Sequence, residues 1–476
     1  MNLNQTLQEK YPHLEVSVLK LSEVKKNIDF RIDDSFWTMK LIYNNKLNYK
    51  KIGECLLKSQ YGISINMNEE GDGVPIYRMN DIDNMLCNFE VKKYALIDKN
   101  ELQTFRLNYG DVLFNRTNSY EFVGRTGIFY NNRENFVFAS YLVRLVCNKE
   151  ILLPEYLTVF LNTHIGKKEI RRRARPSINQ TNVNPEELKE IKIPIFPMEF
   201  QLEIQNLVKD SHKALEESKE LYKKAEETLY LELGLDPKNP LQSLLDSKID
   251  HSMKSLNISI RTLKESFLKT GRLDSEYYQS KYEDIEKFIK SYPNGYDSFS
   301  SIINNKDTNF TPKNNENYSY IELANIGNNG NISEPISDLG KNLPTRARRI
   351  VSKGDVIISS IEGSLSSCAL ITQEFDKHLV STGFFVLNSK LLNGETLLVM
   401  FKSQIFQEYL KKFPSGTILC AINKEELSKI LIPKIDSTTQ EKIAKYIQES
   451  FNLRKKSKQL LDNAKIKVEE QIQGKI

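Results

Sequence analysis

The residues best suited to chemistry in this chain are a run of six cations within residues 167–175, followed by amide and hydroxyl side chains up to residue 182. Lysine and arginine neutralise phosphates, while arginine, asparagine and glutamine can form paired hydrogen bonds with guanine or adenine edges. A single surface cation is usually only solvated, but this density favours contact with DNA. The predicted DNA-contacting residues are Arg116, Asn118, Arg125, Lys167, Lys168, Arg171, Arg172, Arg173, Arg175, Asn179, Gln180, Arg346, Arg348 and Arg349.

The common catalytic motifs are absent. None of the five histidines has the spacing of a paired metal site, and the sequence nearest to a phosphate-binding loop, Gly124–Gly127, lacks the lysine. There is no GxSxG elbow. The candidates for a methyltransferase base-binding loop, Asn184-Pro185 and Asn239-Pro240, have a single proline and no following aromatic residue. We therefore predict a non-enzymatic chain without a metal site, whose catalysis, if any, is done by a partner.

Length and composition set outer limits on the class of protein. The chain has 476 residues, which suggests about three domains of roughly 150 residues or two larger ones. Hydrophobic residues make up 39%, which excludes wholesale disorder. No apolar stretch approaches the roughly 18 residues that would cross a membrane, and the N-terminus lacks a secretory pattern. Five scattered cysteines argue against a disulfide framework, so we expect a cytoplasmic protein.

Internal repetition is the most informative feature of the sequence. Four segments recur in the same order about 240 residues later, which chance similarity does not produce. We conclude that the chain is a tandem duplication. The repeated pairs are Arg31–Trp37 with Arg272–Tyr278, Ile76–Ile82 with Tyr320–Ile326, Leu107–Phe114 with Val351–Ile358, and Glu186–Pro194 with Glu425–Pro433.

Each copy has the same internal plan, a region of short strands followed by a long helix. Val112–Phe114 and Val356–Ile358 are predicted buried strands that each follow a Gly-Asp turn. The Ile-x-Ile-Pro segments are predicted short strands that end where proline removes a hydrogen-bond donor. The expected fold class is therefore α+β, with two such domains in tandem.

The long helices share a heptad pattern. Their apolar and small residues alternate steps of four and three, and the second helix repeats the first in phase 239 residues later. Small residues at matching places allow close approach, which favours pairing of the two helices over separate packing on their own domains. The seam residues are Ile204, Val208, Ser211, Leu215, Ser218, Tyr222, Ala225 and Leu229, matched by Ile443, Ile447, Ser450, Arg454, Ser457, Leu461, Ala464 and Val468.

Antiparallel pairing of the two helices would give a spacer with pseudo-twofold symmetry and one globular domain at each end. The 26 residues from Ile204 to Leu229 would span about 39 Å at ~1.5 Å per residue. One turn of B-DNA repeats in roughly 34–36 Å, so two such domains could meet one face of a duplex about one turn apart. This geometry favours a bipartite DNA target.

The sequence resembles the specificity subunits of Type I restriction–modification systems over essentially its whole length. The Arg-[Ile/Leu]-Asp-x-x-aromatic-aromatic motifs, the Gly-Asp-Val-[Leu/Ile] strands and the Leu-x-x-Ile-x-Ile-Pro…Gln-x-x-Ile runs carry the resemblance. It implies two target recognition domains, each followed by a helix, and a subunit without catalytic residues. The corresponding boundaries are 1–198 and 256–436 for the recognition domains, 199–235 and 437–476 for the helices, and 236–255 for a linker.

The resemblance also implies the partners. These are double-stranded DNA, two methyltransferase subunits and a restriction subunit, with no membrane. S-adenosylmethionine, ATP and Mg would belong to the partner subunits, and no cofactor to this chain. An extra repeated segment precedes each Arg-x-Asp motif, at Val16–Leu21 and Ile258–Leu263. A comparable segment occurs in Type IIB-like systems, where one partner both methylates and cuts, so the partner set stays open.

Two alternatives belong to other classes. The first is an autonomous methyltransferase or nuclease with an unrecognised active site, which the absent motifs disfavour. The second is a coiled-coil scaffold without a DNA role, which would leave the basic and polar loops unexplained.

Overall fold

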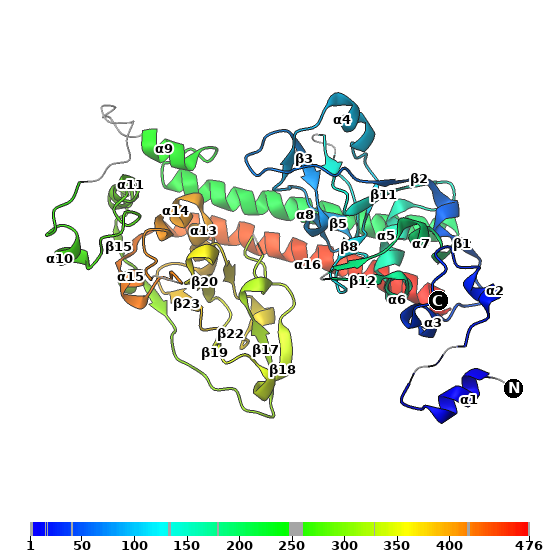
Figure 1. Ribbon diagram of the computed structural model, residues 1–476. Coiled ribbons are helices and arrows are strands. Elements are labelled where there is room, and N and C mark those ends of the chain that lie inside the picture. The colour runs from blue at the N-terminus through cyan, green and yellow to red at the C-terminus, as the bar shows by residue number, and fades with distance from the viewer. Residues whose placement is uncertain are drawn as a thin grey trace. The chain divides into compact units, whose positions relative to one another are not determined.

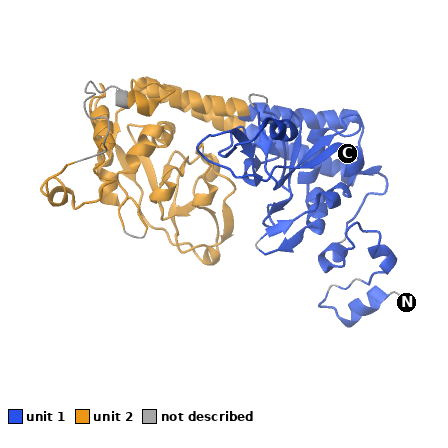
Figure 2. Cartoon of the chain, turned by 45° about the horizontal axis from the view of Figure 1, so that its top comes forward, with its two compact units in different colours: residues 1–215, 455–476 blue, residues 216–454 orange. Residues whose placement is uncertain are grey.

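The computed structural model describes residues 3–14, 16, 18–39, 41–131, 135–178, 180–246, 260–327, 329–416 and 419–474. They form two compact units (Figure 2). Unit 1 consists of residues 1–215 and 455–476, and unit 2 of residues 216–454. Both units draw on the same two long helices, α8 (Met198–Glu232) and α16 (Ser437–Gln473) (Figure 1). The predicted α+β fold, with two β-rich domains each followed by a long helix, is confirmed.

Unit 1 is built around a six-stranded sheet in the order β2-β11-β7-β9-β5-β4, within the described residues. Smaller sheets are β10-β3-β6, β12-β13-β8 and β1-β14. The strands are β1 (Tyr49–Lys51), β2 (Leu56–Tyr61), β3 (Val74–Tyr77), β4 (Ile82–Asp83), β5 (Leu86–Cys87), β6 (Tyr94–Ala95), β7 (Val112–Asn115), β8 (Thr117–Asn118), β9 (Thr126–Ile128), β10 (Val137–Phe138), β11 (Leu142–Cys147), β12 (Arg175–Ser177), β13 (Gln180–Asn182) and β14 (Lys192–Pro194). The shorter helices are α1 (Leu3–Lys10), α2 (Leu21–Val24), α3 (Asp34–Thr38), α4 (Lys99–Phe105), α5 (Pro154–Asn162), α6 (His164–Arg173) and α7 (Pro185–Lys189).

Unit 2 contains the sheets β16-β23-β20-β21, β18-β17-β22-β19 and β15-β24 in its described part. Its strands are β15 (Tyr296–Ser298), β16 (Ile303–Asn305), β17 (Asn317–Ile321), β18 (Ile336–Leu339), β19 (Ala347–Ile350), β20 (Val356–Ser359), β21 (Cys368–Leu370), β22 (Leu379–Ser381), β23 (Phe384–Ser389) and β24 (Leu431–Pro433). Its shorter helices are α9 (Pro240–Asp246), α10 (Phe267–Thr270), α11 (Ser280–Lys290), α12 (Phe299–Ile302), α13 (Gly394–Lys402), α14 (Gln404–Leu410) and α15 (Lys424–Lys429).

The repeated sequence segments form equivalent structures in the two units. β7 and β20 are buried throughout and each follows a Gly-Asp turn in which the glycine has a positive φ, 89° at Gly110 and 88° at Gly354. A side chain would strain that conformation. The aspartate carboxylates accept hydrogen bonds from the backbone of Asn108 and Ser352, at 2.8 and 2.7 Å. The repeated segment before each Arg-x-Asp motif is described only in part, because residue 17 and residues 258–259 lie outside the described ranges.

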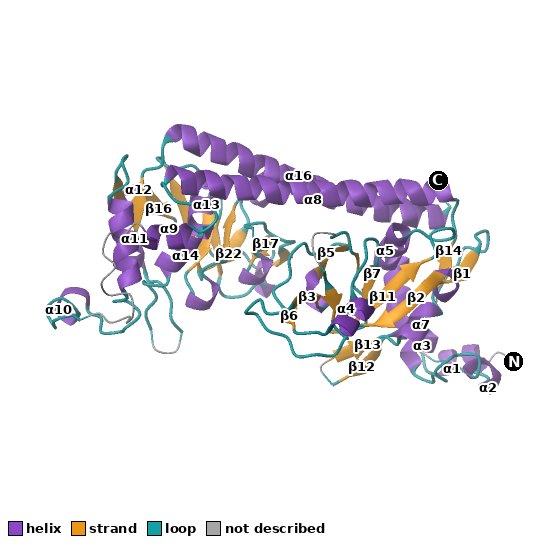
Figure 3. Ribbon diagram, turned by 90° about the horizontal axis from the view of Figure 1, so that it is seen from above, coloured by secondary structure: helices purple, strands orange, loops and turns teal. Residues whose placement is uncertain are grey.

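The seam residues of α8 and α16 pair antiparallel inside each unit (Figure 3). In unit 1 the hydroxyls of Ser211 and Ser457 lie 2.7 Å apart, and in unit 2 those of Ser218 and Ser450 lie 3.0 Å apart. The apolar seam residues also belong to the hydrophobic core of each unit. The predicted pairing is therefore confirmed, and the same seam packs on the β-rich domains. No helix in the described ranges combines the length and the apolar character that crossing a bilayer requires.

The small seam residues lead to a testable expectation. Ser450 is fully buried where the two helices touch, so Ser450→Leu would force extra volume into a packed interface. We expect a loss of about 1–3 kcal/mol in the free energy of unfolding, since overpacking costs that much in well-packed cores. Thermal unfolding followed by circular dichroism measures it. Asn452→Leu, on the exposed side of the same helix, is the matched control and should have little effect.

Candidate nucleic-acid interface

The first repeated motif forms a clamp in unit 1. Arg31 donates from Nε to Asp33 at 2.7 Å and from Nη1 to the carbonyl oxygen of Arg173 at 2.8 Å. Its guanidinium lies over the ring of Phe36, 4.8 Å from the centroid, and Trp37 Nε1 donates to its carbonyl oxygen. Burial raises the pKa of Asp33, but the hydrogen bond and charge of Arg31 outweigh it and lower that pKa overall.

Unit 2 repeats this clamp atom by atom. Arg272 donates from Nε to Asp274 at 2.7 Å, and its Nη1 and Nη2 donate to the carbonyl oxygens of Phe413 and Pro414 at 3.2 and 2.7 Å. The ring of Tyr277 lies below the guanidinium at 4.5 Å. In each unit the clamp therefore holds the backbone at the start of the segment that leads to the Glu-Glu-Leu helix. That helix is α7 in unit 1 and α15 in unit 2.

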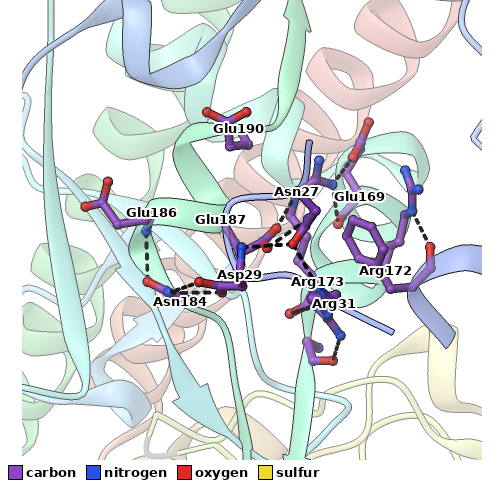
Figure 4. A network of polar contacts seen from close by, with 12 residues as sticks. Asn27, Asp29, Arg31, Glu169, Arg172, Arg173, Asn184, Glu186, Glu187 and Glu190 are labelled. Carbon is purple, nitrogen blue, oxygen red and sulfur yellow. Dashed lines mark hydrogen bonds and ion pairs between the residues drawn. The ribbon is translucent and has the colours of Figure 1, made fainter. Parts of the chain in front are cut away.

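The cation run of residues 167–175 lies mostly on α6, and its buried members have structural partners (Figure 4). Arg173 donates to the carboxylate of the buried Glu169 and lies 3.6 Å from the buried carboxylate of Glu187. Arg172 donates from Nε to the carbonyl oxygen of Phe36 at 2.6 Å and stacks over its ring. Burial lowers the pKa of Arg172. Arg172 thus fastens the Arg-x-Asp segment to α6, and Arg173 links α6 to α7.

Three other predicted residues come together at the surface of unit 1. Arg125, Lys167 and Arg171 line a hollow of about 280 Å³, together with Lys465 from α16. Two carboxylates, Asp83 and Glu121, line it as well. Partial burial, followed by repulsion from Lys465, Arg171 and Arg125, lowers the pKa of the exposed Lys167. The cations are thus close enough to repel one another, and a bound anion would relieve that repulsion.

The arginines of this surface are supported by aromatic rings instead of carboxylates. Arg125 lies over Phe122 with its guanidinium 4.1 Å from the ring centroid, and Arg171 lies over Tyr120 at 5.6 Å. Among the described residues, Arg125, Arg171 and Lys167 form no ion pair. A guanidinium stacked on a ring keeps its hydrogen-bond donors available for a phosphate or a base edge.

The other predicted residues of unit 1 that the structure describes do not line this hollow. Asn118 lies on β8, which pairs with β13, the strand that carries the exposed Gln180. Arg175 is exposed on β12 and forms an ion pair with Asp29. Arg116 stacks over Tyr61 at 5.0 Å, and Lys168 is half-buried on α6. Asn179 lies outside the described residues.

The predicted arginines of unit 2 gather near β19. Arg346 is exposed just before the strand. Arg348 donates from Nε to the carbonyl oxygen of Thr345 at 2.8 Å, and Arg349 donates from Nη1 to the carbonyl oxygen of Phe384 at 3.0 Å. Burial lowers the pKa of Arg349. Arg346 is thus the most accessible of the three.

Lys465 was not among the predicted residues. It follows the seam residue Ala464 directly on α16, and it reaches the hollow only because the C-terminal part of α16 belongs to unit 1. The aromatic supports Tyr120 and Phe122 were also missed. Their proximity to Arg125 in the sequence was the available signal.

Known proteins resemble the chain in the way its repeats suggest. The family model of the Type I restriction modification DNA specificity domain matches residues 48–227. The putative type I restriction enzyme MjaX specificity subunit of Methanocaldococcus jannaschii is 22% identical over 425 residues, covering 88% of this chain and 91% of that protein. The EcoKI specificity subunit of Escherichia coli is 27% identical over 161 residues, about a third of each chain. The crystal structure of the Type I system S subunit from M. genitalium aligns with a TM-score of 0.42 at 14% identity, covering 90% of this chain and 96% of that one.

The duplicated β-rich domain followed by a long helix and the family match define a class of DNA specificity subunit. Residues 48–227 belong to the DNA specificity domain family of Type I restriction–modification systems. Over most of its length the chain is similar to a specificity subunit of these systems, and such subunits are non-catalytic. The resemblance drawn from the repeated motifs is thereby confirmed.

Proposed function

We propose that the chain reads a bipartite double-stranded DNA target, one part with each unit, and positions methyltransferase and restriction subunits on it. The observation that carries this proposal is the surface formed by Arg125, Lys167 and Arg171, whose charges have no ion-pair partner among the described residues. Because the accessible side chains of the two units differ, the two parts of the target should differ in sequence.

The same proposal assigns the chemistry to other chains. S-adenosylmethionine, ATP and Mg would be bound by the methyltransferase and restriction subunits in the cytoplasm. The domain boundaries remain predictions. They are 1–198 and 256–436 for the recognition domains, 199–235 and 437–476 for the helices, and 236–255 for the linker. Whether the partners are of Type I or Type IIB-like composition is part of the test.

A genome-wide map of methylated adenines, made with and without this gene in the cell of origin, tests the proposal. We expect deletion to remove methylation from one asymmetric, two-part motif. An unchanged map would count against the proposed function. A purified chain that methylates or cleaves DNA by itself would replace it with an enzymatic one.

The exposed cations should contribute affinity without sequence preference. Arg171→Ala and Lys167→Ala, alone and combined, are expected to weaken binding to a duplex of arbitrary sequence. The plot of log affinity against log salt concentration should become shallower by about one per lost phosphate contact. Fluorescence anisotropy at several salt concentrations measures both quantities. Lys58→Ala, an exposed lysine on β2 away from this surface, is the control. An unaltered slope in the double variant would remove these residues from the interface.

A further inference from the structure

The clamps formed by Arg31 and Arg272 have the same target in both units, the start of a hairpin. In unit 1, the clamped carbonyl groups of Arg173 and Ala174 directly precede β12, which pairs antiparallel with β13. In unit 2, the clamped Phe413 and Pro414 precede Ser415, which exchanges two backbone hydrogen bonds with Ala421 at 3.0 and 3.1 Å. The repeated Arg-x-Asp motif thus fixes the base of a hairpin in each unit.

The far strand of each hairpin is fixed as well. Val183, just after β13, donates its N–H to the carbonyl oxygen of Arg116 at 2.9 Å. Ile422 donates in the same way to Ser360 at 2.8 Å. Both strands of each hairpin are therefore attached to the unit at their base. A side chain on such a support needs little further ordering to bind a ligand.

One face of the unit 1 hairpin carries hydrogen-bonding side chains. Arg175 pairs with Asn182 and Ser177 with Gln180, so these four side chains share a face. Arg175, Ser177 and Gln180 are exposed, whereas Thr181, on the other face, is buried. Arg175 forms an ion pair with Asp29, whereas Gln180 is a side chain of the kind that forms paired hydrogen bonds with adenine.

Each hairpin also exposes a large apolar side chain near its turn. Ile178, directly after the last paired residue of β12, is 90% exposed, and Leu419 of unit 2 is 67% exposed. Single exposed apolar residues are common on proteins. Here each hairpin has one, at different positions: Ile178 lies five residues before Val183, and Leu419 lies three residues before Ile422.

We propose that this hairpin is the base-reading element of each unit and enters the major groove of DNA as a two-stranded ribbon. The inference rests on the proposed function and adds the element that specifies the sequence. The major groove, about 12 Å wide, accepts a two-stranded β-ribbon. Gln180 would meet a base edge, Ile178 would pack on a thymine methyl group, and the cations around Lys167 and Arg171 would hold the adjacent phosphates. In unit 2, Leu419 would make an apolar contact of the same kind in the other part of the target.

Methylation mapping of cells that carry single substitutions tests this inference in the intact complex. Gln180→Ala and Ile178→Ala should relax one or two positions within one part of the methylated motif, with roughly a 10- to 100-fold loss of discrimination there. The other part of the motif should stay as it was. Leu419→Ala should show the reverse pattern. Ile42→Ala is the matched control, because Ile42 is also 90% exposed in unit 1 and lies outside the hairpin.

The outcomes separate the two proposals. If the wild-type gene specifies a two-part motif and all three hairpin variants specify the same motif with the same stringency, the hairpin is not the reading element. Relaxation of both parts by one variant would also overturn the inference. If deletion of the gene leaves the map unchanged, the proposed function itself fails. Unfolding curves of the purified variants should match the wild type, because the altered side chains are exposed.

Discussion

Arg173→Ala is expected to destabilise unit 1 by about 3–5 kcal/mol, the usual cost of removing one partner from a buried ion pair. The side chains of Glu169 and Glu187, each 1% exposed, would lose the cation between them. Tyr43 donates to Glu169, and Asn27 Nδ2 donates to Glu187 at 3.2 Å, but neither neutralises a carboxylate. Burial, and then the charge of Glu169, raise the pKa of Tyr43 well above its ordinary value. This phenol therefore stays protonated and remains a donor.

The measurement can be confined to unit 1 because the chain has a single tryptophan, Trp37, next to the clamp. Its fluorescence during denaturant unfolding reports on this unit alone. Arg171→Ala, two residues away on the exposed side of α6, is the matched control and should change stability by no more than about 0.5 kcal/mol. The double variant Arg173→Ala with Glu169→Gln should recover part of the loss. A loss below about 1 kcal/mol for Arg173→Ala would mean that water reaches the carboxylates.

The contrast between Arg171 and Arg173 shows where sequence reasoning reached its limit. Both belong to one basic run, and composition alone treats them as equivalent. On α6 the buried residues Gly166, Glu169, Ile170 and Arg173 follow a helical spacing of three and four, so the helix places Arg173 inward and Arg171 outward. That spacing was available in the sequence, but it becomes informative only once the run is assigned to a helix.

The framework was predictable because its residues are repeated. Gln201 and Gln440 illustrate the point. Each amide ties the start of a long helix to the loop before α5 or α13. Gln201 donates to the carbonyl oxygen of Ile151 at 3.1 Å and accepts from the N–H of Leu153 at 2.9 Å. Gln440 donates to the carbonyl oxygen of Leu391 at 3.1 Å and accepts from the N–H of Asn393 at 2.9 Å. A buried amide with several partners cannot be exchanged without leaving polar groups unpaired. Such residues persist in both copies and reveal the duplication.

The exposed residues of the hollow and the hairpin were less predictable, because they are not repeated between the two copies. Lys465 lies about 300 residues from Lys167 in the sequence, and only the antiparallel pairing of α8 with α16 brings it to the hollow of unit 1. Which residues share the hairpin face with Gln180 depends on the strand register. Segment 175–182 is short and polar, so no apolar pattern in the sequence specifies that register. Exposed residues also differ between the copies, so the repeat carries no information about them.

The two clamps should respond unequally to the same substitution. Arg31→Ala would leave the carbonyl groups of Arg173 and Ala174 without their donor and uncover the ring of Phe36. Each unsatisfied buried carbonyl costs about 1–3 kcal/mol. We discount the ion pair itself, because the Asp33 side chain is 40% exposed and solvent screens it. A loss of about 3 kcal/mol in unit 1 is therefore expected, again read from Trp37 fluorescence.

Arg272→Ala should cost unit 2 less, because the Arg272 side chain is 12% exposed against 3% for Arg31. Water can partly replace the lost donors there. The reporter for unit 2 is built from the repeat, with Tyr278→Trp at the position equivalent to Trp37 and Trp37→Tyr to silence the original signal. If the clamp acts through the hairpin, both substitutions should also relax the DNA sequence that is read by their own unit. A conservative Arg→Lys change should restore stability only in part, since lysine cannot bridge a carboxylate and two carbonyl groups at once. Equal losses in both units would show that burial does not govern the strength of the clamp.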